Sequence, residues 1–285
     1  MQVRPWDQLE TGSFAPPGAS MPLQSIRVVN WNINRGQQLN AVLDFLRDAA
    51  ADVVLLQESD VNAQRTQRRN VAREIAEALR MNYVFGREFE ELTQGDHNSP
   101  AYHGQAALSR LPLSSSRILR FHMQSGFWHP RWFIPNIQKS QRRLGARMAL
   151  ITEITWSERS LIVYNLHLES RGDNALRRSQ LTQVLEDARQ LISETPVVIA
   201  GDFNIDLSRQ PDISIIGDAR FNNPFNNGNV RPTTARSRLG RARTIDWILT
   251  RGPLVCVRAE LHDSVDASDH YPMSLTLVPR VVSNS

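Results

Sequence analysis

The stretch that most constrains this chain of 285 residues runs from Val197 to Asn204. Its sequence, Val-Val-Ile-Ala-Gly-Asp-Phe-Asn, is an apolar run rich in β-branched residues that stops abruptly at Gly201, which indicates a buried strand. Side chains two residues apart on an extended backbone point to the same side, so Asp202 and Asn204 are predicted to lie together where this strand ends. The C-terminal ends of core strands are where α/β proteins often place their chemistry.

Chemically similar residues end other apolar runs along the chain. They are Asn32, Glu58, His167, Asp246, Asp269 and His270. Burying several carboxylates together is unfavourable unless a cation or a histidine compensates for their charge. Mg²⁺ does so with one or two protein carboxylates and keeps positions for water and phosphate oxygens. We therefore expect these strand ends to converge on a divalent cation beside a phosphate ester.

Composition excludes several other classes of protein. Hydrophobic residues make up 41% of the chain, which is enough for a large core. The single cysteine, Cys256, excludes an internal disulfide framework and a cysteine-rich zinc site. No apolar run is long enough to span a membrane, and the first 25 residues lack the basic start and apolar centre of a signal peptide. These features predict a soluble, cytoplasmic protein, and we expect it to be a monomer.

Positive charge is concentrated in two segments. Residues 97–152 contain no acidic residue but eight cations, and residues 219–245 contain no acidic residue but six arginines. Scattered surface charge would normally intersperse acids with bases. The two segments therefore favour a positive surface that faces an anionic, phosphate-bearing partner.

The order of the predicted elements favours two packed sheets. Strands are predicted at 26–33, 52–56, 83–89, 106–109, 117–121, 148–156, 161–168, 197–202, 244–249, 255–261 and 271–278, and helices at 39–46, 70–80 and 175–192. Two strand–helix steps followed by closely spaced strands do not suit a doubly wound parallel sheet. Two mixed β-sheets packed face to face, with helices on the outside, fit better. We expect one domain over residues 25–280, a flexible N-terminal arm over 1–24, and a short tail over 281–285.

Six motifs in order resemble those of the endonuclease/exonuclease/phosphatase superfamily, which has the deoxyribonuclease-I-like fold. They are Trp31-Asn32-Ile33-Asn34, Gln57-Glu58-Ser59, Asn165-Leu166-His167-Leu168-Glu169-Ser170, Gly201-Asp202-Phe203-Asn204, Ile245-Asp246-Trp247-Ile248-Leu249 and Ser268-Asp269-His270. The resemblance spans residues 26–278 and implies an α/β (α+β) fold, a four-layered α/β sandwich of two mixed sheets flanked by helices. It also implies a phosphoric ester hydrolase that uses Mg²⁺ or Mn²⁺.

The resemblance also implies a role for each motif residue. Glu58 would be the principal metal carboxylate, with Asn32 and Asp269 completing the metal and water shell. Asp202 would align and deprotonate the attacking water, and Asn204 would bind a non-bridging phosphate oxygen. His167 would help to stabilise charge on the phosphoryl group. His270 would contact the scissile phosphate, and Asp246 would accept the other ring proton of His270. Whether Asp202 or His270 is the general base stays open.

Three classes of substrate or partner remain open. A nuclease or nucleic-acid phosphodiesterase would use the positive segments to bind phosphates and the aromatic residues of the loop over 121–145 to stack on bases. A phosphatase or sphingomyelinase-like phospholipase would instead bring the same loop to an anionic membrane surface, and a catalytically inactive chain would only bind nucleic acid. Candidate substrate-binding residues are Tyr164, Arg131, Arg142, Arg143 and Arg236. At the position of His167 the abasic-site endonucleases have an amide. In this respect the chain resembles the deoxyribonuclease, tyrosyl-phosphodiesterase and sphingomyelinase branches more closely. Tyr164 would touch phosphate or, as a strand aromatic, lie in the core.

Overall fold

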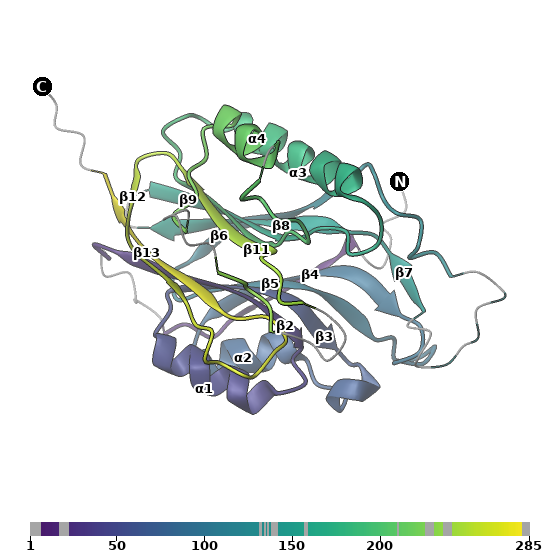
Figure 1. Ribbon diagram of the computed structural model, residues 1–285. Helices are drawn as coiled ribbons and strands as arrows, with labels where there is room; N and C mark the ends of the chain where they lie inside the picture. The colour runs from purple at the N-terminus through teal and green to yellow at the C-terminus, as the bar shows by residue number, and fades with distance from the viewer. Residues whose placement is uncertain are drawn as a thin grey trace, which may run out of the picture.

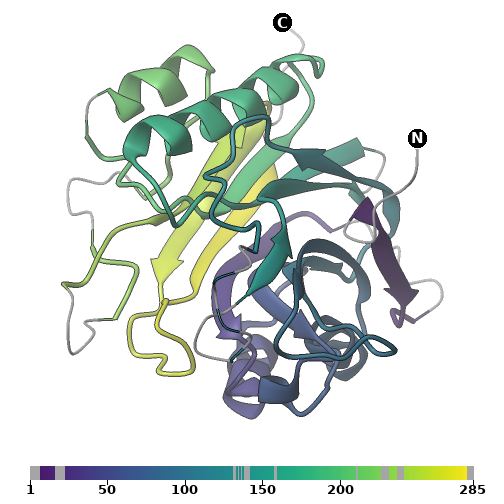
Figure 2. The same cartoon turned by 90° about the vertical axis from the view of Figure 1, so that its right-hand side faces the viewer.

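The computed structural model describes residues 7–16, 23–130, 133, 135, 137, 142–156, 159–209, 211–225, 231–235 and 241–280. Two β-sheets lie face to face between two layers of helices, as Figures 1 and 2 show from two directions. Helices α1 (Leu39–Ala49) and α2 (Val71–Leu79) cover the outer face of the larger sheet. Helices α3 (Asn174–Arg189) and α4 (Asp212–Asp218) cover the smaller sheet. The predicted four-layered sandwich of two mixed sheets is therefore confirmed.

Among the described residues, the larger sheet has eight strands in the order β1-β4-β5-β3-β2-β13-β12, with β7 paired to β4. These strands are β1 (Leu9–Ser13), β2 (Ile26–Arg35), β3 (Val53–Val61), β4 (Asn82–Glu91), β5 (Tyr102–Ser109), β7 (Arg143–Gly145), β12 (Leu254–Leu261) and β13 (Met273–Pro279). The smaller sheet, in the part of the chain that the structure describes, has five strands in the order β11-β10-β9-β8-β6. They are β6 (Leu113–Arg120), β8 (Met148–Trp156), β9 (Arg159–His167), β10 (Val197–Asp202) and β11 (Asp246–Arg251), and a 3₁₀ turn covers Gln64–Thr66.

Alternation along β10 divides the core into layers. Val198 and Ala200 pack between the two sheets, whereas Val197 and Ile199 pack on the side of α3. Both faces of the strand are buried, which explains why its sequence is continuously apolar rather than alternating. A third apolar cluster, beneath α1 and α2, covers the outer face of the larger sheet.

Three buried amides interrupt the apolar layer between the sheets. We call Asn30, Gln57 and Asn165 the amide cluster; none is exposed. Gln57 Nε2 donates to Asn30 Oδ1 at 2.8 Å and to Asn165 Oδ1 at 2.6 Å. Asn165 Nδ2 donates in turn to the carbonyls of Leu56 and Ala106, each at 2.9 Å. Because Asn165 belongs to the smaller sheet and its partners to the larger one, the cluster joins the two sheets by directional bonds.

Part of the segment 1–24, predicted as a flexible arm, forms a strand, and residues 1–6 and 17–22 lie outside the described residues. Leu9–Ser13 form β1, which pairs antiparallel with β4, and Glu10 accepts a hydrogen bond from the Tyr83 hydroxyl at 2.7 Å. This strand has only one large apolar residue, so its sequence carries no strand periodicity and its partner decides its conformation. Strand β7 and helix α4 were likewise not predicted. The predicted tail over 281–285 lies outside the described residues.

Candidate active site

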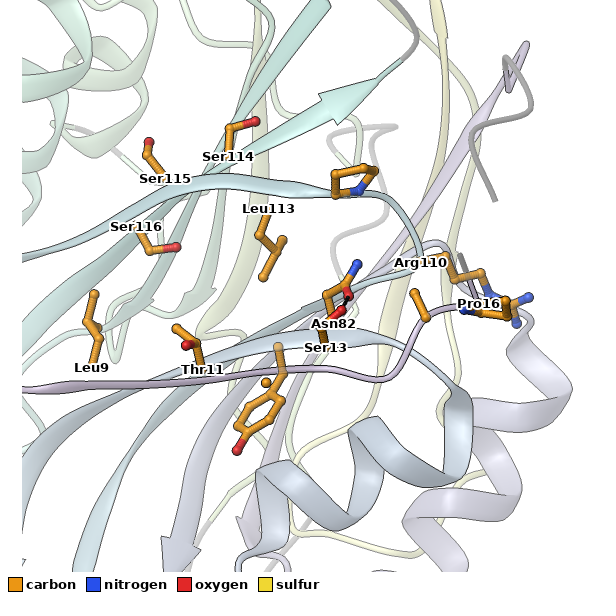
Figure 3. A pocket seen from close by; sticks show the side chains of 14 residues that line it. Leu9, Thr11, Ser13, Pro16, Asn82, Arg110, Leu113, Ser114, Ser115 and Ser116 are labelled. Carbon is orange, nitrogen blue, oxygen red and sulfur yellow. Dashed lines mark hydrogen bonds between the residues drawn. The ribbon is translucent and has the colours of Figure 1, made fainter. Parts of the chain in front are cut away.

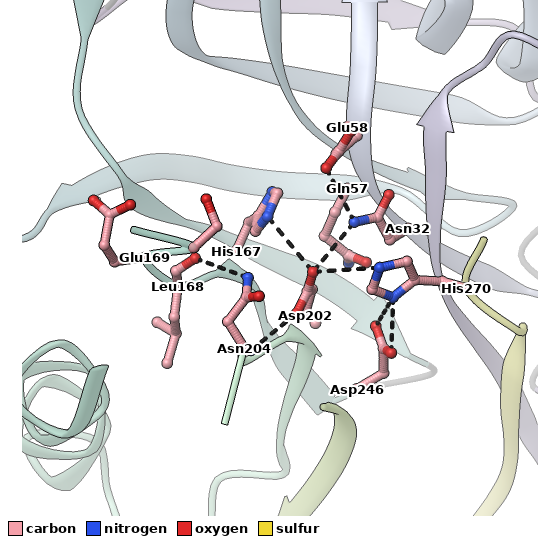
Figure 4. Close-up of polar contacts among 12 residues, drawn as sticks. Asn32, Gln57, Glu58, His167, Leu168, Glu169, Asp202, Asn204, Asp246 and His270 are labelled. Atoms are coloured by element: carbon pink, nitrogen blue, oxygen red, sulfur yellow. Dashed lines mark hydrogen bonds and ion pairs between the residues drawn. The ribbon is translucent and has the colours of Figure 1, made fainter. Parts of the chain in front are cut away.

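The site lies near the C-terminal ends of β2, β3, β9 and β10 and at the start of β11, and Figure 4 shows the side chains that these strands bring together. In the larger sheet β2 and β3 run parallel, which places Asn32 beside Gln57 at their C-terminal ends. In the smaller sheet Asp202 at the end of β10 pairs with His167 of β9 and with Asp246 of β11. Strand pairing thus brings together side chains that lie far apart in the sequence.

Two site residues have unusual backbone conformations. Glu58 has φ +55° and Asn204 has φ +52°, in the left-handed region that residues other than glycine rarely adopt. The pairing of β3 is irregular between Leu56 and Ser59, so Glu58 sits in a bulge. Such conformations each cost roughly 1–3 kcal/mol and persist where the surrounding structure holds them. Here the bulge directs the Glu58 carboxylate toward Asn32.

The Asp202 carboxylate is at the centre of the contacts. Its Oδ2 accepts a hydrogen bond from Asn32 Nδ2 at 3.3 Å and lies 3.6 Å from His167 Nε2 and 3.8 Å from His270 Nε2. Its Oδ1 accepts from the backbone N–H of Asn204 at 2.9 Å. Burial raises the pKa of Asp202 to about 7, although the charge of His270 acts in the opposite direction.

His270 is held by a carboxylate on its other side. Its Nδ1 lies 2.9 and 3.0 Å from the two carboxylate oxygens of Asp246, and the Thr233 hydroxyl donates to Asp246 at 2.6 Å. Burial disfavours the protonated imidazole, but the charges of Asp246 and Asp202 outweigh it and raise the pKa of His270 to about 10. Nε2 is therefore the ring nitrogen that faces Asp202, and the imidazole carries a charge at neutral pH.

His167 has the opposite electrostatic environment. Burial, reinforced by the Arg147 guanidinium, lowers its pKa well below the ordinary value, so this imidazole is neutral. Its Nδ1 lies 3.7 Å from a carboxylate oxygen of Glu88, which also pairs with Arg147 at 3.3 Å. Glu88 and Arg147 were not predicted as site residues, because an acid and a base that pair inside a sandwich look like ordinary surface charges in the sequence.

Glu58 and Asn32 supply the oxygens that suit a hard cation. Asn32 Nδ2 approaches Glu58 Oε1 at 3.4 Å, and the Glu58 side chain is 21% exposed, so a ligand can reach it. Burial opposes ionisation, but nearby positive charges, those of His103 and Arg35 foremost, hold the pKa of Glu58 well below its usual range. An ionised carboxylate beside an amide is a donor set that fits Mg²⁺ or Mn²⁺.

Asp269 lies at the edge of this arrangement. Asp269 is exposed, and its carboxylate accepts a hydrogen bond from the Ser268 hydroxyl at 3.4 Å. Within the described ranges, ionisable groups close enough to share an ion are Asp202, Asp246 and His270 in one cluster and Asp60, Glu91 and His103 in a second, separate one. The structure thus brings together seven of the eight predicted catalytic and metal residues and leaves Asp269 at the rim.

The predicted substrate-binding residues do not form a group. Tyr164 is fully buried on the α3 side of β9, where its hydroxyl donates to Asp187 at 2.7 Å, because residues 164 and 167 point to opposite faces of the strand. Arg143 is 5% exposed and its Nε lies 2.7 Å from Glu91, so it is part of a buried ion pair. Arg142 is half-buried beside β7. Arg131 and Arg236 lie outside the described residues.

A large cavity lies away from this chemistry. It has a volume of about 760 Å³ and lies between β1 and β6, the edge strands of the two sheets (Figure 3). Hydroxyl and apolar side chains line it, among them Thr11, Leu113 and Ser116. None of the predicted site residues lines it, so cavity size does not locate the active site in this protein.

The sequence matches the model of the endonuclease/exonuclease/phosphatase family over residues 29–270. The chain belongs to this family. Members are metal-dependent phosphoesterases, so the chain is a hydrolase of phosphoric esters. A comparison with curated protein sequences found no significant match.

Solved structures with the same fold agree with the family. An endonuclease/exonuclease/phosphatase from Beutenbergia cavernae is 19% identical with a TM-score of 0.64, covering 90% of this chain and 72% of its own. A humanized D. rerio TDP2 is 19% identical with a TM-score of 0.61, covering 90% of this chain and 99% of its own. D. rerio TDP2 in complex with a single-strand DNA product is 18% identical with a TM-score of 0.60, at the same coverage. At this identity the likeness shows the fold, and no helix in the described part of this chain is long and apolar enough to cross a membrane.

Proposed function

We propose that this chain is a Mg²⁺-dependent nucleic-acid phosphodiesterase that hydrolyses the ester by in-line attack of water. The observation that carries the proposal is the position of the Asp202 carboxylate. It lies within 4 Å of Asn32, His167 and His270, and Asn32 in turn contacts Glu58. A base, a cationic imidazole and a carboxylate that can hold a metal thus border one space. That combination is what displacement at phosphorus requires.

The pKa values favour Asp202 as the general base. A base works best when its pKa lies near the operating pH, and that of Asp202 is raised to about 7. His270, whose pKa is raised to about 10, is already protonated at neutral pH and so cannot accept the proton. It would instead donate from Nε2 to the phosphoryl oxygens, and Asp246 would keep it charged and oriented.

The other groups would position the ester. Asn204 would donate its side-chain N–H to a non-bridging oxygen, and the neutral His167 would donate a hydrogen bond to the phosphoryl group. Glu58 and Asn32 would hold the Mg²⁺, which when bound supplies a Lewis acid that offsets the negative charge developing on phosphate. Mn²⁺ has the same ligand preference and is expected to substitute.

A nucleic acid is favoured over a lipid phosphate by the groups around the site. Arg35, Arg171 and Arg243 lie near the strand ends, and Arg171 is stacked on the half-exposed ring of Phe127 at 4.7 Å. Positive charge beside an exposed aromatic ring is the combination that binds a phosphate backbone with its bases. The solved structure of a TDP2 with a single-strand DNA product concerns a protein of the same fold, which adds support.

The test is a panel of phosphoesters with Mg²⁺, with Mn²⁺ and with chelator. The panel holds single- and double-stranded oligonucleotides, a phospholipid, an inositol phosphate and bis-p-nitrophenyl phosphate. We expect cleavage of an oligonucleotide that needs the metal and that Asp202→Asn abolishes. The matched control is Asp187→Asn, which removes a carboxylate from the far side of the smaller sheet and should keep turnover. Release of headgroup or phosphate from the lipid or inositol phosphate, with intact oligonucleotides, would overturn the nucleic-acid assignment.

A further inference from the structure

A second polar cavity opens directly beside the active site. It has a volume of about 470 Å³ and is bordered by Asn204 on one side and by the N-terminal turn of α3 on the other, with Asn174 and Arg178 in its wall. Asn204 therefore belongs both to the catalytic cluster and to this cavity. A substrate whose scissile phosphate contacts Asn204 would extend into the cavity with its next group.

The charges in this cavity do not cancel. Its wall contains three arginines and two carboxylates. Asp212 accepts two hydrogen bonds from Arg178, at 2.7 and 3.2 Å, and Asp206 lies 3.1 Å from Arg209. Arg243 has no carboxylate partner among the residues that the structure describes. Among the described residues that border the cavity, one cation is thus left over, because both carboxylates are already paired.

Arg243 is held by its backbone, and its guanidinium makes one hydrogen bond among the residues that the structure describes. Its N–H donates to the Thr234 hydroxyl at 2.8 Å, and its carbonyl accepts from the backbone N–H groups of Thr233 and Thr234 at 2.8 and 3.0 Å. The side chain is exposed, and its Nη2 donates to the carbonyl of Asn204 at 3.3 Å. A fixed backbone with an exposed head group beside Asn204 keeps four of the five guanidinium N–H donors available to a ligand.

A second guanidinium adds to the positive potential. Burial and then the charge of Arg243 lower the pKa of Arg177, so these two cations lie close enough to repel each other. Arg177 uses its own N–H groups on the carbonyls of Glu169 and Ser170 and on the side chain of Asn174. It therefore contributes charge but few donors, and an anion placed at Arg243 would relieve the repulsion.

We propose that this cavity binds a phosphate next to the scissile one, with Arg243 as the residue that contacts it. The proposal rests on the proposed function and adds a substrate class to it: chains of at least two phosphodiesters rather than isolated esters. An isolated ester fills only the catalytic cluster, whereas an oligonucleotide supplies a second phosphate on the same backbone. A guanidinium fork is suited to such a phosphate because it can donate two parallel hydrogen bonds.

The test compares Arg243→Ala with wild type on a single-stranded oligonucleotide and on bis-p-nitrophenyl phosphate, with Mg²⁺ at several salt concentrations. We expect Arg243→Ala to raise KM for the oligonucleotide about tenfold, the range for one charge-assisted contact. The slope of log KM against log salt should fall by roughly 0.7, the value for one phosphate contact on a single strand. Arg243→Lys keeps the charge and should restore the slope. A general disturbance of the fold would not alter the salt slope in this way.

The matched control is Arg231→Ala. Arg231 lies in the same segment of chain and is exposed, but it pairs with Asp263 at 2.7 Å and does not border the cavity. It should change neither the oligonucleotide KM nor its salt slope. If wild type cleaves the oligonucleotide and Arg243→Ala keeps both values, the subsite is refuted while the proposed function stands. If wild type cleaves no nucleic acid but cleaves an inositol phosphate in an Arg243-dependent manner, the second phosphate belongs to that ligand and the nucleic-acid assignment fails.

Discussion

Asp246→Asn isolates the electrostatic part of the proposed mechanism, because it removes a charge and keeps the size and shape of the side chain. Asp246 is the largest of the charges that raise the pKa of His270 from 6.5 to about 10. At about 1.4 kcal/mol per pKa unit, this rise corresponds to an interaction on the order of 5 kcal/mol between the imidazolium and its surroundings. Without Asp246, the charges of Asp202 and Asp269 still raise the pKa of His270, but burial opposes them, so the pKa should fall well below 10. We expect this fall to leave His270 neutral at pH 8.

The assay has two parts. In metal-free protein, ¹⁵N NMR of the imidazole should show His270 protonated on both nitrogens at pH 8 in wild type and on one in Asp246→Asn. With Mg²⁺, kcat should fall by roughly 10²–10³, the usual effect of losing one hydrogen-bond donor to the charge that develops in the transition state. Asp187→Asn, which removes a charge near Tyr164 instead, should leave both readouts unchanged. An imidazole that stays doubly protonated at pH 8 in Asp246→Asn would refute the reasoning.

The same interaction predicts how stability depends on pH. Because the folded pKa of His270 is raised, its stabilising contribution is complete below pH 6.5 and is lost as the pH rises through about 10. The free energy of unfolding of the metal-free protein should therefore decline between these values, and it should decline less in Asp246→Asn.

Three further perturbations have expected outcomes. Glu58→Gln should abolish turnover and weaken Mg²⁺ binding in calorimetry, whereas unchanged Mg²⁺ affinity would exclude Glu58 as a ligand. Gly201→Ala should destabilise the fold by about 3 kcal/mol in urea denaturation, because its Cβ would lie 2.0 Å from the carbonyl oxygen of Leu166; wild-type stability would show that the sheet yields. Tyr164→Phe should cost about 1 kcal/mol of stability through the lost bond to Asp187 and leave KM unchanged, and a raised KM would restore its predicted contact with phosphate.

The sequence predicted those parts of the fold that local patterns encode. Apolar runs with sharp polar ends located the strands that carry Asn32, His167 and Asp202, because such strands are buried on both faces. Strand β1 was missed since its five residues contain one leucine, and only pairing with β4 makes them a strand. The position of Tyr164 was open in the sequence, and only the packing of α3 on its face of β9 decides it.

The arginines show a limit of reading charge from sequence alone. An acid-free segment predicted a positive surface, yet Arg143 and Arg147 turn inward to Glu91 and Glu88, which lie more than fifty residues earlier in the chain. Charge compensation over such separations is a property of the folded sheet and leaves no local pattern. By contrast, Arg243 is an excess cation because Asp206 and Asp212 pair with other arginines in the folded chain.

The amide cluster has a consequence for how this protein tolerates mutation. Hydrocarbon contacts between two sheets are non-directional, so they allow small sliding at little cost. The hydrogen bonds from Gln57 and Asn165 are directional and do not allow such sliding. The residues that meet at Asp202 come from both sheets, so their positions depend on how the sheets are aligned. Substitutions in the inter-sheet layer that shift one sheet over the other should therefore impair turnover well before they lower the melting temperature. The core substitutions that this protein tolerates should therefore be limited by the alignment of the site residues of the two sheets, and less by the stability of the fold.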